Sequence, residues 1–209
     1  MGQKTTADYW FQKGNKSFKL GQYKIARRAY ENVVKIDPQN ADAWNNIGIS
    51  RYALGFIEDA VNAHDRAIQI NPLFKEAWCN KGNALAQQDK YDNAIQAFDK
   101  AIELNSNFVE AWINKGNTLK LLGKYDEALQ AFDEAIKLKP DYVAAWNNKG
   151  NMLCDMGKYV EAIQAYDKAI ELNPSFAVAW YNKGRALKKH NHNIEANDAF
   201  ARARELEGK

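Results

Sequence analysis

The segment KEAWCNKGNALAQQDKYDNAIQAFDKAIELNSNF, residues 75–108, is followed at once by VEAWINKGNTLKLLGKYDEALQAFDEAIKLKPDY, residues 109–142. Both segments are 34 residues long and share one pattern. The same spacing separates all six tryptophans of the chain, which are Trp10, Trp44, Trp78, Trp112, Trp146 and Trp180. A fixed period of this length indicates a row of supersecondary units, each of which covers the core face of its neighbour.

Other residue types recur on the same period when Ala7 is counted as position 1. Position 8 is always glycine, although glycine inside a helix costs about 1 kcal/mol relative to alanine. The six glycines are Gly14, Gly48, Gly82, Gly116, Gly150 and Gly184. They indicate that another helix approaches closely, and the small residues at positions 20 and 27 are expected to allow that approach. Large side chains should fill the surrounding space: the tryptophans and, at position 24, Tyr30, His64, Phe98, Phe132, Tyr166 and Phe200.

Turn residues divide each repeat into two helices. Position 15 is Gly21, Gly55, Gly123 or Gly157 in four repeats and Asp89 or Asn191 in the others, which suits the left-handed conformation that ends a helix. Proline at position 32 ends the second helix in four repeats, as Pro38, Pro72, Pro140 and Pro174. Each repeat is therefore predicted to contain helix A at about positions 1–14 and helix B at about positions 18–31.

These columns together resemble the tetratricopeptide (TPR) repeat family over residues 7–209, and the W-x-N-K-G-N wording is similar to archaeal and other prokaryotic members. The resemblance implies an all-α fold, a right-handed superhelical solenoid of six helix-turn-helix repeats. One solenoid domain is expected after an N-terminal tail of residues 1–6, with repeats at 7–40, 41–74, 75–108, 109–142, 143–176 and 177–209.

One departure from the family recurs at position 7, which is usually leucine there. It is lysine in five repeats, as Lys13, Lys81, Lys115, Lys149 and Lys183. Since this position flanks the buried stripe of helix A, the lysine stem is expected to pack while its ammonium group reaches water.

The last repeat is modified where a following repeat would pack. Its positions 21 and 28 are Asn197 and Arg204, whereas repeats 2–5 have Ile, Val or Leu there. An uncapped end exposes its stacking face in a one-dimensional fold. Three interpretations stay open: the last repeat is its own cap, a capping helix belongs to a longer protein, or the end face pairs with another molecule.

Asparagine recurs on the face of helix A that is directed away from the buried stripe. Nine asparagines form two rows: Asn46, Asn80, Asn114, Asn148 and Asn182 at position 6, and Asn15, Asn83, Asn117 and Asn151 at position 9. The family resemblance places the A helices on a concave wall, so these amides are predicted to line a groove. Each amide offers two donors and an acceptor for the peptide groups of an extended partner. The rows are similar to the asparagine row of O-linked N-acetylglucosamine transferase TPR domains, which holds the substrate backbone. The alternative is that they connect neighbouring repeats.

Aromatic side chains beside the amides are candidates for specific contacts with the partner. Phe11 and Phe18 lie seven residues apart, nearly on one line of the first helix, and Tyr52 lies in the second repeat. Exposed aromatics suit the apolar anchors of a protein partner. For Phe11 and Phe18 the alternative is an N-terminal cap that packs on itself.

Charge and hydropathy exclude several classes of protein. Residues 1–40, 41–176 and 177–209 carry net charges of +5, −5 and +3, which is not the continuous basic stripe of a nucleic-acid binder. No apolar run is long enough to cross a membrane, and the N-terminus lacks the apolar core of a secretion signal. Cys79 and Cys154 fall in repeats that are not neighbours, so we expect no disulfide and a cytoplasmic protein.

Some members of the family hold the C-terminal carboxylate of chaperones with asparagines and three cations. The corresponding positions of repeats 1–3 are Phe11, Asn15, Asn46, Glu76 and Asn80, so the asparagines are present and every cation is missing. Because a carboxylate needs charge-assisted donors, we expect no such clamp.

No group of residues indicates an enzyme. The sequence has no phosphate-binding loop or dinucleotide fingerprint. His64 occupies an aromatic core position, and His190 and His192 lie in a turn without further metal ligands nearby. We therefore expect no catalytic residue, no metal and no cofactor.

The sequence thus predicts a scaffold that binds a peptide or protein segment in an Asn-lined groove. Two other functions stay open. One is an assembly module that forms homodimers through its terminal repeats, and the other is a TPR domain detached from a larger enzyme.

Overall fold

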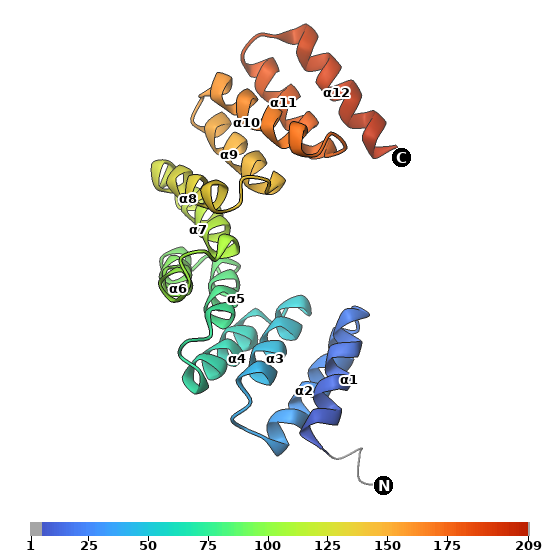
Figure 1. The fold of residues 1–209 in the computed structure, drawn as a ribbon, viewed down its shortest axis with the longest axis vertical. Helices are drawn as coiled ribbons and strands as arrows, with labels where there is room; N and C mark the ends of the chain where they lie inside the picture. The colour runs from blue at the N-terminus through green and yellow to red at the C-terminus, as the bar shows by residue number, and fades with distance from the viewer. Residues whose placement is uncertain (1–5, 209) are drawn as a thin grey trace. The chain divides into compact units, whose positions relative to one another are not determined.

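The computed structural model describes residues 6–208, which contain twelve α-helices and no strand (Figure 1). The chain divides into two compact units, residues 1–111 and 112–209, and each is described by itself. No helix among the described residues is both long enough and apolar enough to cross a membrane.

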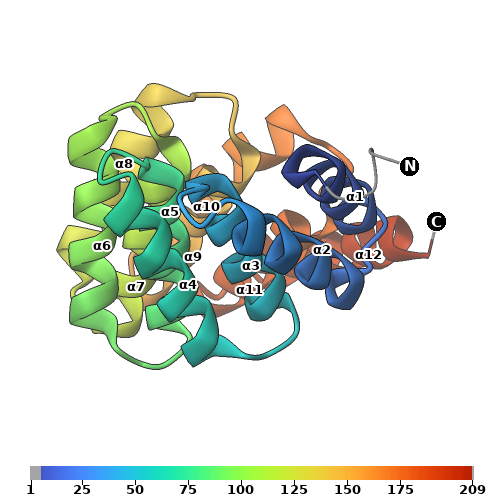
Figure 2. The same ribbon diagram turned by 90° about the horizontal axis from the view of Figure 1, so that it is seen from below.

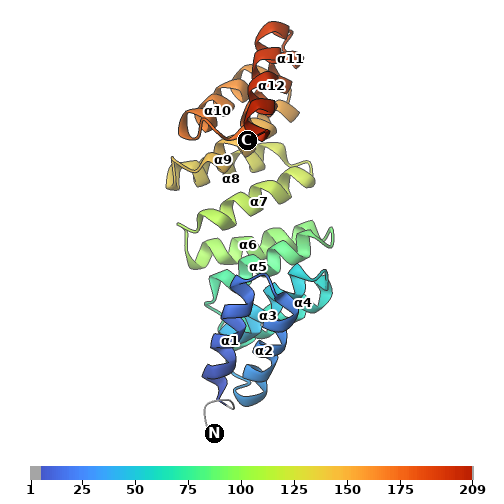
Figure 3. The same ribbon diagram turned by 90° about the vertical axis from the view of Figure 1, so that its right-hand side faces the viewer.

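Unit 1 consists of three consecutive helix pairs. Its helices are α1 (Ala7–Lys19), α2 (Tyr23–Ile36), α3 (Ala41–Ala53), α4 (Ile57–Ile70), α5 (Lys75–Ala86) and α6 (Tyr91–Leu104). Each helix packs against the next along the chain. The first pair, α1 and α2, lies side by side in Figure 1, Figure 2 and Figure 3.

Unit 2 repeats the arrangement. Helix α7 (Val109–Leu121) begins at the end of unit 1, and α8 (Tyr125–Leu138), α9 (Val143–Asp155), α10 (Tyr159–Leu172), α11 (Ala177–Lys189) and α12 (Asn193–Glu207) follow. Consecutive helices from α8 to α12 pack against one another. The all-α repeat fold predicted from the sequence is confirmed, and helix B begins at position 17, one residue earlier than predicted.

The turns inside the repeats have the predicted left-handed backbone. Gly55 has a φ of 83° and no atom near the place where a Cβ would lie, so its only requirement is conformational. Asp89 and Asn191 replace glycine with φ values of 58° and 66°. These two residue types tolerate that region best after glycine, which explains why the same turn forms in repeats 3 and 6.

The glycine at position 8 makes room for an aromatic ring. A Cβ on Gly82 would lie 2.6 Å from Cε1 of Phe98, and one on Gly150 would lie 2.5 Å from Cε1 of Tyr166. The atoms nearest to the glycine belong to the position 24 ring, and the small residues at positions 20 and 27 of helix B are buried, as their predicted role in a close helix approach requires. That ring is buried in repeats 1–5, and it packs against helix A at the place where glycine has no side chain.

The tryptophan at position 4 holds the turn before its own helix. Its indole Nε1 donates to the carbonyl oxygen of the proline six residues earlier, at 2.8–3.0 Å, in the pairs Trp44–Pro38, Trp78–Pro72, Trp146–Pro140 and Trp180–Pro174. This bond fixes the direction in which the chain leaves helix B and enters the next helix A.

The lysine at position 7 joins neighbouring repeats. Its ammonium group lies 2.6 Å from an aspartate on helix B of the preceding repeat, in the pairs Lys81–Asp65, Lys149–Asp133 and Lys183–Asp167. The same nitrogen lies over the tryptophan of its own helix, at 5.4 Å from the ring centroid for Lys81 and 5.7 Å for Lys149. The lysine stem packs as predicted. Its ammonium group is only partly exposed, because it contacts a carboxylate and an indole face.

Candidate partner-binding surfaces

Two amides of the position 9 row are held by a tyrosine of the same repeat. Tyr30 donates its hydroxyl hydrogen to Oδ1 of Asn15 at 2.8 Å, and Tyr166 donates to Oδ1 of Asn151 at 2.8 Å. Burial raises the pKa of Tyr30 to about 12 and also raises that of Tyr166, so both phenols stay protonated and act as donors. Because the bond engages the carbonyl oxygen, it leaves the two N–H donors of each amide unused.

The other two amides of that row have a phenylalanine instead of a tyrosine beside them. Asn83 is half-buried, and no side-chain hydrogen bond forms to it within residues 6–208. Asn117 is exposed and accepts a long bond of 3.4 Å from Nδ2 of Asn148. The row therefore contains tyrosine-held amides at its two ends and amides without that restraint between them.

The position 6 amides connect repeats, as the alternative interpretation of the rows expected. Asn80 donates to Oδ1 of Asn45 at 3.2 Å, and Asn182 donates to Oδ1 of Asn147 at 3.1 Å. Asn182 is only 8% exposed, so it is a packing residue in this structure rather than a surface donor. Asn80 and Asn148 are half-buried and use one donor each.

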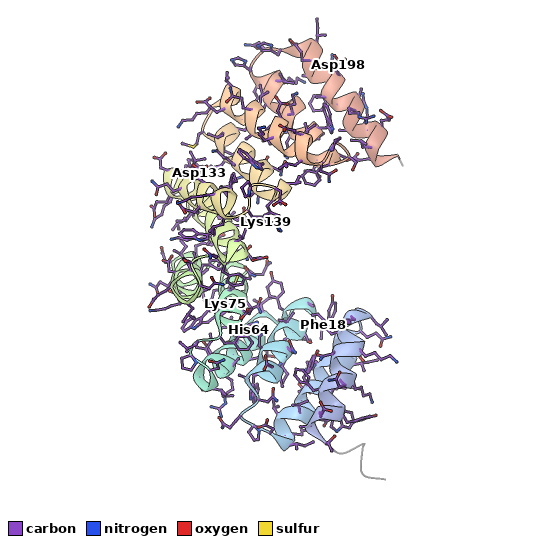
Figure 4. All side chains as sticks on the ribbon, viewed as in Figure 1. Phe18, His64, Lys75, Asp133, Lys139 and Asp198 are labelled. Carbon is purple, nitrogen blue, oxygen red and sulfur yellow. The ribbon has the colours of Figure 1, made fainter. Side chains whose placement is uncertain are left out.

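The acceptors of these bonds, Asn45 and Asn147, were not among the residues predicted from the sequence. Both lie at position 5 and are buried. Asn45 Oδ1 also lies 2.9 Å from Nδ1 of His64, a side chain that is 1% exposed. Burial lowers the pKa of His64 to about 4, so the ring is neutral and donates its Nδ1 hydrogen to the amide oxygen. The prediction of His64 as a core residue is confirmed, and Figure 4 labels it in the α3–α4 pair.

The remaining predicted residues differ in how available they are. Asn46 and Asn114 are half-buried, and Tyr52 is exposed. Phe11 and Phe18 are half-buried and make edge contacts with Tyr30 and Tyr23, at centroid distances of 5.7 and 5.3 Å. Figure 4 labels Phe18 near the C-terminal end of α1. Both phenylalanines thus pack within the first repeat, which agrees with the self-packing alternative.

Unit 2 has a small polar pocket on its A helices. The pocket has a volume of about 150 Å³ and is lined by Lys120, Asn151, Cys154, Asp155, Tyr166, Asn182 and Arg185. Lys120 is paired with Asp155 at 2.7 Å, and Arg185 is exposed. Burial raises the pKa of the Cys154 thiol, while the positive charges of Lys189 and Arg185 act in the opposite direction. The pocket thus combines two predicted asparagines with cations that the sequence analysis did not single out.

Two larger pockets lie between helices B and have the same lining in each unit. The one in unit 1 has a volume of about 720 Å³ and is bounded by α4, α5 and α6, with Trp78, Leu85 and Val61 among its lining residues. The one in unit 2 has a volume of about 710 Å³ and is bounded by α8, α9 and α10, with Trp146, Leu153 and Leu129. Since most of the lining residues stand at equivalent repeat positions, these pockets are a product of the repeat. Within residues 6–208, no group of His, Cys, Asp or Glu side chains is arranged to hold a metal ion.

Comparison with family models agrees with this geometry over most of the chain. A tetratricopeptide repeat model matches residues 76–108, 109–142 and 143–176, a TPR repeat model matches residues 14–55, and a further tetratricopeptide repeat model matches residues 165–196. The chain belongs to the tetratricopeptide repeat family. No curated protein matches the sequence.

Solved structures of other TPR proteins share the fold. A MamA protein is 28% identical with a TM-score of 0.70, and the match covers 85% of this chain and 96% of that one. PilF of Pseudomonas aeruginosa is 20% identical with a TM-score of 0.80, covering 97% and 90%. YrrB, described as a TPR protein with an unusual peptide-binding site, is 23% identical with a TM-score of 0.67, covering 86% and 93%. At these identities, PilF and YrrB show the fold alone.

Proposed function

We propose that this protein holds an extended segment of another protein by its main chain, through the amide nitrogens on the A helices of each unit. TPR proteins bind other proteins or peptides, and membership of this family supports a protein-interaction scaffold.

The observation that supports it is the bond between a buried tyrosine and a half-buried asparagine in repeats 1 and 5. The hydroxyl of Tyr30 or Tyr166 fixes the orientation of the amide by engaging its oxygen. A side chain that is already oriented loses less conformational entropy when it binds a ligand. The free amide nitrogen has two N–H groups, which match the carbonyl oxygens of an extended peptide.

Donors of this kind favour the main chain over particular side chains. Every residue of an extended segment has a carbonyl group, and successive carbonyls point to opposite sides of the chain. A row of amide donors therefore contacts alternate residues whatever their side chains are. Selectivity would then come from groups that differ between repeats, such as Tyr52 in unit 1 and Arg185 in unit 2.

The test replaces the donors without disturbing the tyrosines. Peptides that bind the full chain are first selected from a displayed random library, and the affinity of the best one is measured. Asn15→Asp with Asn151→Asp keeps an oxygen that accepts from each tyrosine but removes both N–H donors. We expect the affinity to fall about tenfold or more, because each lost bond leaves a partner carbonyl without a donor.

The matched control is Asn62→Asp with Asn197→Asp, which makes the same change of charge at exposed positions on helices B of the two units. Circular dichroism checks that both double variants keep their helix content. Equal peptide affinities for the two double variants would show that the tyrosine-held amides do not bind the main chain.

A further inference from the structure

Within residues 6–208, no helix covers one surface of the first repeat, at the N-terminal end of unit 1. It encloses a volume of about 540 Å³ lined by Tyr9, Gln12, Lys13, Lys16, Ser17, Leu20, Gln22 and Ile25. We call this set the N-terminal end surface. Leu20 is 63% exposed and Ile25 is 47% exposed, so an apolar floor faces outward. Two lysines and no acid are among the lining residues.

Inside each unit, the corresponding surface of a repeat is covered by helix B of the repeat before it. In unit 2, α10 presents Ile163 to the cluster that contains Leu187 and Trp180, while Asp167 binds Lys183 at 2.6 Å. Two contacts therefore define how this helix B covers the next repeat. An aliphatic side chain packs against the apolar cluster of that repeat, and an acidic side chain four residues later pairs with its position 7 lysine.

The same pair of contacts recurs elsewhere in the molecule. In unit 2, Leu129 packs against the cluster around Leu153, and Asp133 binds Lys149. In unit 1, Val61 packs against the cluster around Phe98, and Asp65 binds Lys81. The chain thus shows three times which kind of helix covers the equivalent surface of a later repeat.

In the first repeat the lysine is present and its carboxylate partner is missing. Lys13 lies 4.8 Å from the centroid of the Trp10 ring, like the other position 7 lysines, but no ion pair to it forms within residues 6–208. The surface differs from its interior equivalents at two positions. Position 11 is Ser17, where the covered repeats have Leu85, Leu153 and Leu187, and position 19 is more apolar. Ile25 stands at position 19, where the later repeats have Asp59, Asn93, Glu127, Glu161 and Glu195.

We propose that the N-terminal end surface binds an acidic amphipathic helix of another protein, which takes the place that helix B of a preceding repeat takes elsewhere. Its aliphatic side chains contact Leu20 and Ile25, and its acidic side chain pairs with Lys13. The charge of the surface is complementary to such a helix, and the geometry continues an interface that the molecule already contains.

A second copy of this chain is a poorer occupant. The helix that would have to cover the surface in a head-to-tail pair is α12, and its positions 21 and 25 are Asn197 and Ala201. It therefore lacks both the aliphatic side chain and the acid of the interior cover.

The experiment uses the chain's own cover helix as the probe. A fluorescent synthetic peptide with the sequence of residues 159–174 is stapled on its outer face to keep it helical, and its binding to the full chain is followed by anisotropy. We expect Asp167→Asn in the peptide and Lys13→Gln in the protein to weaken binding about twofold to fivefold each, as for a partly exposed ion pair. The two changes together should cost no more than either alone, because they remove the same contact.

Ile25→Asp tests the apolar part of the surface. Since most other repeats carry an acid at this position, the variant is expected to fold, and we expect it to weaken peptide binding about tenfold or more by placing a charge on the apolar floor and repelling the acidic probe. The matched control for Lys13→Gln is Lys35→Gln, which makes the same change at an exposed position of α2 outside the N-terminal end surface. It should bind the peptide as the unchanged protein does. The Asn15→Asp, Asn151→Asp double variant should also bind the probe normally, which separates this surface from the proposed main-chain site.

Three results would overturn the proposal. The first is absence of peptide binding at millimolar concentration. The second is binding that Ile25→Asp leaves unchanged. The third is a concentration-dependent dimer, seen by light scattering, that Ile25→Asp dissociates, because a second copy would then be the occupant.

Discussion

Repeats 2 and 5 have helices of the same lengths and the same glycine at position 8, but they use position 24 differently. In repeat 5 the hydroxyl of Tyr166 reaches Asn151 at position 9, whereas in repeat 2 the shorter ring of His64 bonds Asn45 at position 5. The glycines beside the two rings are equally close, since a Cβ on Gly48 or Gly150 would lie 2.5 Å from the ring. The polar group on the ring, and not the backbone, thus determines which position of helix A needs an amide.

The comparison also separates two reasons for asparagine on helix A. Where position 24 is tyrosine, position 9 is an asparagine that accepts its hydroxyl hydrogen, and where it is His64, position 9 is Ile49. Repeats 3 and 4 have phenylalanine at position 24 and still have Asn83 and Asn117 at position 9. No phenol needs an acceptor there, so packing within the repeat does not explain these two amides. Asn117 accepts the bond from Asn148 of the next repeat, whereas Asn83 has no side-chain hydrogen bond within residues 6–208, so Asn83 is the amide that the proposed main-chain site would explain.

The largest expected effect comes from acid, through the buried ring of repeat 2. Burial lowers the pKa of His64 from 6.5 to about 4. Between these two pH values the imidazole of His64 is protonated in the unfolded chain but neutral in the folded chain. The resulting loss of stability is absent above pH 6.5, grows as the pH falls, and is complete below about pH 4. Its full size is about 3 kcal/mol, at about 1.4 kcal/mol per pH unit.

The measurement is urea unfolding of the unchanged protein and of His64→Phe across this pH range. Phenylalanine fits beside Gly48 as Phe98 fits beside Gly82, so the variant is expected to fold. The free energy of unfolding of the unchanged protein, relative to the variant, should fall as the pH is lowered from 6.5 to 4. Parallel pH curves for the two proteins would show that His64 is not the acid-sensitive group.

The sequence predicts the fold of this molecule almost completely because its signals are local and repeated. The spacing and the turn residues placed the helix ends to within two residues, and glycine, aspartate and asparagine marked the left-handed turns. The partner of the position 7 lysine was not predicted, because it is not a neighbour in the sequence. Its partner lies sixteen residues earlier on another helix, as Asp133 does for Lys149. A search for charges paired at that spacing would have found these ion pairs before the structure did.

The candidate site was harder to predict, because its hydrogen bonds depend on how helices stack. Asn15 and Asn151 lie fifteen residues before the tyrosines that hold them, and Asn182 lies thirty-five residues after its acceptor Asn147. An asparagine column looks the same in the sequence whether its members are buried or exposed. Only the packing of one repeat on the next distinguishes the buried Asn182 from the half-buried Asn83.

A middle-sized effect on stability is expected when Tyr166 of repeat 5 loses its hydroxyl group. Repeats 3 and 4 have phenylalanine at this position. Tyr166→Phe should lower the free energy of unfolding by about 1 kcal/mol, the usual contribution of one such hydrogen bond. The cost stays near that value because Asn151 is half-buried and its oxygen is able to turn to water. The reverse change, Phe98→Tyr, supplies a hydroxyl beside Asn83 and should be neutral or stabilising. Urea unfolding of both variants checks the pair, and a strongly destabilised Phe98→Tyr would show that Asn83 is not placed to accept the bond.

The smallest effect concerns position 7, where repeat 2 has the fully buried Ile47 and repeat 5 has Lys149. Lys149→Met keeps the apolar stem but removes the ion pair with Asp133 and the contact with the Trp146 ring. The lysine side chain is 24% exposed and the aspartate side chain 49% exposed, so the loss should be about 0.5–1 kcal/mol in low salt. High salt should reduce the difference, since it screens exposed charges. Asp133→Asn should cost a similar amount, and the double variant should cost little more than either single one. If instead the two single losses add, the lysine and aspartate act independently, and the position 7 lysine does not couple the repeats through charge.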